Sequence, residues 1–205
     1  MMTTKQWSLF KENLGTQNPV FVQVLGICST LAVTNVLKNT LVMCLGLIFV
    51  TALSNLTLSL LRVWIPPRIR MMVEVLVIAC LVMLVDIYLK AYAPAISRQL
   101  GPYVGLIITN CIIMGRAEAV ALTSPPKTAL IDGLSSGIGY AYVLLIIAAV
   151  RELLGTGGIW GVTLLGGGWQ NWTIMVMAPG GFFVLALFIW IVKGWILNPA
   201  RKAQA

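Results

Sequence analysis

Two cysteines lie at matching positions in two similar stretches of the chain. Pro19 is followed nine residues later by Cys28. Pro102 is likewise followed nine residues later by Cys111. The residues between each proline and cysteine are almost all apolar, but each run is too short to cross a bilayer before a polar residue arrives. Matched short hydrophobic segments in two halves of a membrane protein indicate a site where the halves meet. Because the matched residue is a thiol, we expect a metal or redox centre there.

The absence of histidine narrows the chemistry of such a centre. The chain contains no histidine, so the commonest metal ligand and proton shuttle is missing, and a metal here needs cysteine or oxygen ligands. Iron–sulfur clusters take four protein ligands, usually cysteines, of which Cys28 and Cys111 supply half. The remaining ligands would come from Cys44 and Cys80 or from another chain. A pseudo-two-fold arrangement, in which a second chain of the same fold gives two cysteines of its own, favours another chain.

Plainer roles for the cysteines are open as well. Each of the four cysteines can serve as a small buried hydrophobic residue, and we expect this role for Cys44 and Cys80, which lie inside long apolar segments. The same role is an alternative for Cys28 and Cys111. A structural disulfide between those two is a further alternative, which their depth in the membrane disfavours.

The composition indicates a polytopic membrane protein. Of 205 residues, 59% are hydrophobic and 10% are charged, whereas a soluble domain has about 25% charged residues. The formal net charge is +8, but the basic residues lie at the ends of apolar segments. We therefore interpret them as determinants of topology and expect no nucleic-acid partner. No cleavable signal peptide is evident at the N-terminus.

The apolar pattern predicts an all-α integral membrane protein with six spans. They are the segments 19–36, 40–62, 71–92, 102–117, 129–151 and 174–196. We expect one membrane domain over residues 1–205, with residues 1–18 as an N-terminal segment on the cytoplasmic side. Its two inverted three-helix repeats would span residues 19–92 and 102–196, each beginning with a short or broken helix. Ten of the 14 Lys and Arg residues lie on the side that holds both termini, which places both termini in the cytoplasm.

Several strings of residues resemble a known family over nearly the whole chain. They are LGICSTLAVT (25–34), TALSNLTLSLLR (51–62), LIITNCIIMGRAEA (106–119), LIDGLSSGIGY (130–140) and RELLG (151–155). The chain resembles the D subunits (NqrD) of the sodium-translocating NADH:quinone reductases. Its resemblance to the E subunits of the paralogous Rnf complexes is nearly as strong. The most specific string is TNCIIMGRAEA.

The resemblance implies a multi-pass component of a respiratory complex in the bacterial inner membrane. In the family, the D subunit pairs with a homologous protein of inverted topology, the E subunit. Each gives two cysteines to one [2Fe-2S] cluster within the membrane, and the matching residues here are Cys28 and Cys111.

The resemblance also implies an electron relay coupled to sodium export. Electrons pass from NADH through FAD and a ferredoxin-like cluster to the intramembrane cluster, then to FMN, a second FMN, riboflavin and ubiquinone. The flavins belong to the remaining subunits, A, B, C and F. No flavin or NADH site is recognisable in this sequence, so we expect no turnover from the isolated chain.

Intramembrane charges are functional candidates by default. Asp86 and Asp132 are our candidates for a sodium path, because a hard cation takes oxygen ligands. Lys90 lies four residues after Asp86, which is the spacing of a simple ion pair on a helix. Arg116 either offsets the charge of a nearby cluster or forms an interface pair with Glu118.

Two further charged positions complete this group. Glu74 lies in the same predicted span as Asp86, twelve residues before it, and the neighbours Arg151 and Glu152 end the fifth span. For the arginine–glutamate neighbours the simplest role is a structural pair at an interface.

Other functional classes remain in competition with the redox subunit. A secondary transporter or ion channel with inverted repeats would need a polar cavity within one chain, and intramembrane polar residues are sparse. A scaffold protein would have no cofactor of its own. A component of an Rnf-type ferredoxin:NAD oxidoreductase differs from one of the sodium-translocating reductase only by degree of resemblance.

Overall fold

The computed structural model describes most of the chain between residues 20 and 202. It describes residues 20, 25–92, 101, 103, 105–159, 162–163 and 172–202. The predicted N-terminal segment 1–18 and both prolines of the repeated pattern lie outside the described residues.

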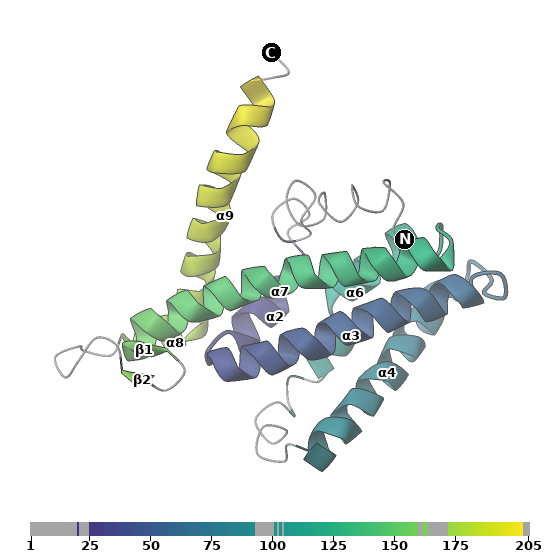
Figure 1. The fold of residues 1–205 in the computed structure, drawn as a ribbon, viewed down its shortest axis with the longest axis horizontal. Coiled ribbons are helices and arrows are strands. Elements are labelled where there is room, and N and C mark those ends of the chain that lie inside the picture. Colours follow the sequence, from purple (N-terminus) through teal and green to yellow (C-terminus); the bar gives the residue numbers. More distant parts are fainter. Residues whose placement is uncertain are drawn as a thin grey trace.

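The described chain is helical apart from one short pair of strands (Figure 1). The elements are α2 (Ile27–Val33), α3 (Leu37–Leu61), α4 (Arg70–Tyr92), α6 (Cys111–Arg116), the π-helix η1 (Ala117–Ala121), α7 (Pro126–Thr156), β1 (Gly158–Ile159), β2 (Val162–Thr163), α8 (Thr173–Val176) and α9 (Ala178–Lys202). The two strands pair antiparallel, with Gly158 opposite Thr163. This strand pair was not anticipated from the sequence.

Three of the helices are long and apolar enough to cross a membrane. They are α3, α4 and α7, and α9 contains a shorter apolar stretch, Pro179–Gly194. The predicted spans 40–62, 71–92 and 129–151 are thus confirmed as membrane-length helices. The predicted spans 19–36 and 102–117 contain the short helices α2 and α6. In each half of the chain, a short helix therefore comes before the longer helices. The complete six-helix inverted repeat stays a prediction.

Helices α3 and α7 form the centre of the bundle and run antiparallel, side by side (Figure 1). Gly133 permits this close approach, because a Cβ atom there would lie 2.9 Å from the Thr51 carbonyl oxygen. One turn later, a Cβ on Gly137 would lie 3.2 Å from the Ile48 Cα. Small residues four apart are a common means of packing helices in membranes. Polar residues accompany them: Thr51, Ser54, Asn55, Asp132, Ser135 and Ser136 are all buried.

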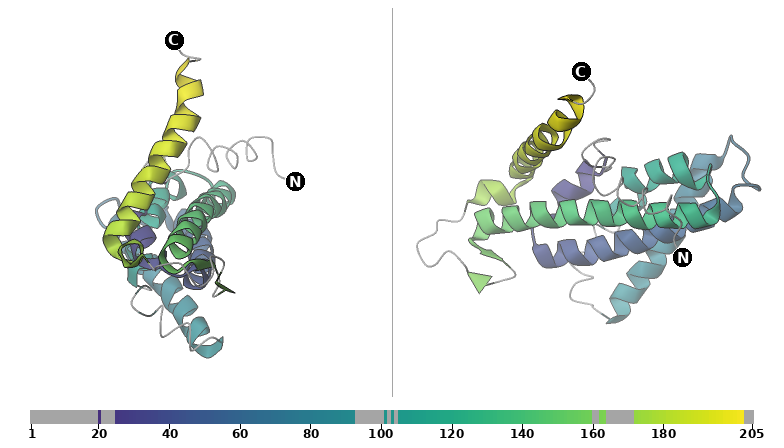
Figure 2. Two further views of the ribbon diagram at one scale, coloured as in Figure 1. Left: turned by 90° about the vertical axis from the view of Figure 1, so that its left-hand side faces the viewer. Right: turned by 45° about the horizontal axis from the view of Figure 1, so that its top comes forward.

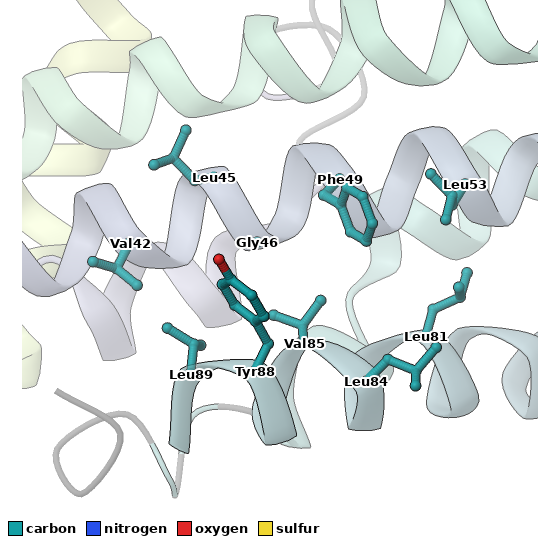
Figure 3. A pocket seen from close by; sticks show the side chains of 10 residues that line it. All are labelled: Val42, Leu45, Gly46, Phe49, Leu53, Leu81, Leu84, Val85, Tyr88 and Leu89. Atoms are coloured by element: carbon teal, nitrogen blue, oxygen red, sulfur yellow. The ribbon is translucent and has the colours of Figure 1, made fainter. Parts of the chain in front are cut away.

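Helices α4 and α9 diverge from this centre (Figures 1 and 2). Between α3 and α4 lies a groove of about 570 Å³ whose lining is almost wholly apolar. Figure 3 shows Phe49 of α3 and Leu84 and Tyr88 of α4 among its lining residues. Most of α4 is exposed, so one side of the bundle presents an apolar surface suited to lipid or to neighbouring membrane helices.

Candidate metal centre

Cys28 lies in the first turn of α2, two residues after the left-handed Gly26. Gly26 precedes the helix with φ of +83°, in the left-handed region that favours glycine. A Cβ atom on Gly26 would also lie 2.7 Å from the side chains of Ile112 and Tyr140. Both the conformation and the close packing require glycine here. The Cys28 side chain that follows is exposed.

Cys111 is the first residue of α6, and its helix begins in a different way. Residues 105–108 are helical, and the helix is interrupted at Thr109 and Asn110 before α6 starts. The Asn110 side-chain oxygen accepts a hydrogen bond from the Ile112 backbone N–H at 3.1 Å, which is a standard helix cap. The predicted broken helix is therefore observed at this position, and Cys111 is half-buried.

The fold brings the two cysteine-bearing turns into direct contact. The backbone N–H of Gly26 donates to the Cys111 Sγ at 2.9 Å. The side-chain amide of Asn110 donates to the Ser29 hydroxyl at 3.2 Å. Residues on both sides of Cys28 thus contact Cys111 and its neighbour. The two turns that contain Cys28 and Cys111 therefore adjoin in space, while their role as ligands of one centre stays a prediction.

A buried tyrosine of α7 supports this junction. The Tyr140 hydroxyl donates to the Gly26 carbonyl oxygen at 3.1 Å and also contacts the Ser29 hydroxyl. Tyr140 is fully buried. The sequence analysis assigned no role to Tyr140, Ser29 or Asn110, although all three lie within the strings that carried the family resemblance.

Buried arginines connect both short helices to α7. At the end of α6, the Arg116 Nε donates to one Asp132 carboxylate oxygen at 3.0 Å, and its Nη2 pairs with the other. Arg151 of α7 donates to the Thr34 hydroxyl at 2.6 Å and to the Leu31 carbonyl oxygen at 3.3 Å, both at the end of α2. The two arginines therefore position the helices that begin with the cysteines.

The arginine and glutamate neighbours predicted to pair with each other, Arg116 with Glu118 and Arg151 with Glu152, instead contact other residues. Glu118 pairs with Arg70 of α4, whereas Arg116 pairs with Asp132. The Glu152 carboxylate accepts from the Leu37 backbone N–H at 2.6 Å, at the start of α3. These residues connect elements within the chain.

The two sodium-path candidates lie in different surroundings. Asp132 is buried against Arg116. Asp86 forms an ion pair with Lys90 at 2.6 Å, which confirms the contact predicted from their spacing. Each of the two carboxylates thus forms an ion pair, Asp86 with Lys90 and Asp132 with Arg116.

The other two cysteines differ from each other. Cys44 is buried between α3 and α7, with its thiol 3.8 Å from the Ala141 carbonyl oxygen, as expected for a small core residue. Cys80 is exposed on α4, so the expectation of burial is wrong for it: no helix of the described residues covers that face of α4. All four cysteines are free thiols. Among the described residues, no group of three or more His, Cys, Asp or Glu side chains is placed to hold a metal. Cys28 and Cys111 are thus two free thiols on adjoining turns.

Comparison with known proteins identifies the family. A family model described as "Rnf-Nqr subunit, membrane protein" matches residues 6–189. The chain belongs to the Rnf-Nqr family. Similar curated members come from Pseudomonas aeruginosa (strain LESB58), Haemophilus influenzae (strain PittGG) and Pasteurella multocida (strain Pm70). All three are named as the D subunit of a Na(+)-translocating NADH-quinone reductase.

The similarity to these Rnf-Nqr proteins extends over most of each chain. The Pseudomonas protein is 48% identical over 183 residues, which cover 87% of this chain and 82% of that protein. The Haemophilus protein is 47% identical over 187 residues, covering 89% and 90%. The Pasteurella protein is 45% identical over 205 residues, covering 98% and 99%. The resemblance inferred from the sequence strings is confirmed, and the chain is a membrane protein.

Proposed function

We propose that this chain is the D subunit of a Na⁺-translocating NADH:quinone reductase, and that Cys28 and Cys111 bind a [2Fe-2S] cluster shared with a homologous inverted protein, the E subunit. The names of the relatives support the complex. The contact between the Gly26 N–H and the Cys111 sulfur is the observation that supports the cluster, because it joins the two cysteine-bearing turns.

The chemistry of the junction suits a cluster at a boundary between two chains. An exposed Cys28 beside a half-buried Cys111 leaves the thiols accessible to a second chain that supplies two more cysteines. A backbone N–H directed at a ligating sulfur stabilises its negative charge and tunes the potential of a cluster. Tyr140 and Asn110 keep the two turns in position.

When bound, the cluster supplies a one-electron relay between carriers on the two sides of the membrane. This chain binds and orients it, and the apolar helices around the junction limit the access of water. FAD, FMN, riboflavin and the ferredoxin-like cluster belong to subunits A, B, C and F in this proposal, and Na⁺ is the transported ion. The complex lies in the bacterial inner membrane, with both termini of this chain in the cytoplasm.

The charged residues take supporting roles in this proposal. Arg116, bound to Asp132, positions α6 rather than facing a cluster as a free cation. Asp86 and Asp132 remain our candidates along a sodium path, with Lys90 and Arg116 as their counter-charges.

The competing functions have less support. The groove between α3 and α4 offers an ion almost no polar ligand, which disfavours a transporter that uses this groove alone. An Rnf-type complex would accept electrons from ferredoxin and reduce NAD. The electron acceptor of the purified complex therefore separates the two redox functions.

The test compares iron content and EPR spectra of the dithionite-reduced, assembled complex. The variants are Cys28→Ala and Cys111→Ala, with Cys80→Ala as a matched control because Cys80 is also an exposed thiol. We expect both test variants to lose the same iron–sulfur signal while the flavins and the other cluster are retained, and the control to keep it. Unchanged iron together with unchanged NADH–quinone activity in both test variants would overturn the cluster assignment.

A further inference from the structure

A continuous apolar stripe on α3 forms one wall of the groove between α3 and α4 (Figure 3). Its residues recur at helical spacing: Val42, Leu45, Gly46, Phe49 and Leu53. Leu53 lies eleven residues after Val42, which corresponds to about 16 Å along a helix. Since the hydrocarbon core of a bilayer is about 30 Å thick, the stripe is as long as one leaflet is deep. One leaflet is also the depth that the acyl chain of a phospholipid reaches.

The two walls of the groove come from helices that follow each other in the chain. A Cβ atom on Gly46 of α3 would lie 3.7 Å from the Val85 Cγ1 of α4, so these two residues face each other across the groove. Because the chain turns back between α3 and α4, the start of α3 and the end of α4 lie at the same end of the groove (Figure 1).

The residues just beyond the apolar stripe at this end are typical of a membrane surface. Lys38 is exposed and precedes Val42 by four residues, so it continues the stripe on the same face of α3. On α4, Tyr88 lines the groove and Tyr92 follows one turn later, with the ring centroids 4.6 Å apart. Tyrosines are enriched where the hydrocarbon core meets the headgroups. This end of the groove therefore lies at the level of the lipid headgroups.

Lys38 gives this end of the groove a positive charge. The other charged groups near it carry opposite charges in pairs: Asp86 forms an ion pair with Lys90, and Arg151 and Glu152 are buried neighbours on α7. The distribution of basic residues predicts that this end faces away from the cytoplasm, where basic residues are fewer. A lysine that continues an apolar groove on that side is complementary to a negatively charged headgroup.

The lining of the groove suits a flexible chain better than a packed helix. Contacts between membrane helices are rich in small and polar residues. Among the residues that line this groove, Gly46 is the one glycine and Tyr88 is the one with a polar side-chain group. Phe49 and Leu84 are 49% and 63% exposed, so the groove is open along its side. Because lipid tails are as apolar as the groove, the headgroup must supply most of the selectivity.

We propose that the groove between α3 and α4 binds one acyl chain of an anionic phospholipid, whose headgroup lies beside Lys38. Gly46 leaves room for the chain at the floor of the groove, and Tyr88 and Tyr92 border the headgroup. This site is independent of the proposed cluster, because it uses neither of the cysteines assigned to that centre.

The first experiment measures the phospholipids that the complex retains after purification in mild detergent, by extraction and mass spectrometry. Gly46→Leu fills the groove from its floor, and its Cβ makes only an ordinary contact with Val85. We expect this variant to lose an anionic phospholipid that the wild type retains. Gly194→Leu on α9 is the matched control, because a Cβ there would meet nothing within 4 Å, and it should retain the lipid.

The second experiment tests the headgroup. Phosphatidylglycerol should protect the delipidated complex against thermal inactivation at lower concentration than phosphatidylethanolamine does. Lys38→Gln keeps the groove and removes the charge, so this preference should fall about fivefold. Lys90→Gln is the matched control, because Lys90 pairs with Asp86. Lys90 also lies two residues after Tyr88, more than half a turn around α4, so its replacement should leave the preference unchanged.

Two results would overturn the proposal. One is an unchanged lipid content in Gly46→Leu together with an unchanged lipid preference in Lys38→Gln. The other is the loss of a protein subunit from Gly46→Leu with its lipids retained, which would show that a helix of another chain fills the groove. If Gly46→Leu does not assemble, the lipid preference of Lys38→Gln decides the question.

Discussion

The two cysteine-bearing helices reach the same junction by different local means. Helix α2 starts after the left-handed Gly26 and has no side-chain cap. Helix α6 starts after Asn110, whose side chain provides the cap. The two halves of the chain therefore share the placement of a cysteine at the start of a short helix, while the residues that produce each start differ.

The arginines that anchor the two helices are arranged in opposite ways. Arg116 lies on α6 and reaches a carboxylate on α7. Arg151 lies on α7 and reaches a carbonyl oxygen and a hydroxyl at the end of α2. Helix α7 is the common support in both cases. Each half thus places a cysteine in the first turn of a short helix, but the two halves differ both in how that helix starts and in the contacts that support it.

The largest expected effect comes from breaking the anchor of α6. Arg116→Met removes the guanidinium that pairs with the buried Asp132 carboxylate, and removing one partner of such a buried pair costs about 3–5 kcal/mol. We expect poor assembly of the complex and loss of membrane iron, measured by thermal stability and iron content.

A double variant sharpens this prediction. Arg116→Met combined with Asp132→Leu removes both charges and should recover much of the assembly. If the double variant assembles no better than the single one, the ion pair is not the reason for the defect.

The next effect separates the two helix starts. Gly26→Ala places a Cβ in a left-handed residue and against Tyr140 and Ile112, at a cost of about 2–4 kcal/mol. The matched control in the other half is Gly105→Ala, because a Cβ on Gly105 would meet nothing within 4 Å. Thermal denaturation of the two variant complexes should differ clearly. Equal midpoints would show that the α2 start tolerates a side chain.

A smaller effect is expected at the cap of α6. Asn110→Ala loses the cap and the bond to Ser29, which together stabilise the start of α6 by about 1–2 kcal/mol. We expect the complex to assemble with an altered EPR signal of the proposed membrane cluster. Asn110→Ser keeps a side-chain cap acceptor without adding a charge, so its spectrum should lie nearer to that of the wild type. An unchanged EPR spectrum in Asn110→Ala would show that the cap of α6 does not influence the proposed cluster.

The smallest effect is expected on the exposed side of α4. Lys90→Met breaks an exposed ion pair with Asp86, and such pairs contribute about 0.5 kcal/mol or less. The thermal midpoint should hardly move. A large loss of stability here would show that Asp86 needs its partner in the way that Asp132 needs Arg116.

Much of the molecule could be predicted from local sequence. The length of the apolar runs identified α3, α4 and α7, since a membrane span needs about 20 apolar residues. The spacing of Asp86 and Lys90 pointed to their ion pair. The matched positions of Cys28 and Cys111 pointed to a shared site, which stays a prediction. The family strings indicated the family that the comparisons confirm.

The sequence by itself therefore determined the class of protein, its long helices, its family and the matched pair of cysteines. Only the tertiary structure decided that Arg116 meets Asp132, sixteen residues away, and that the Gly26 N–H meets Cys111, 85 residues away. It also placed Tyr140 against Gly26 and Ser29, Glu118 against Arg70, and Cys80 in an exposed position. The physical reason is that periodicity and spacing identify neighbours within one helix, three or four residues apart. Contacts between helices depend on how α7 packs against the rest, which no local pattern specifies.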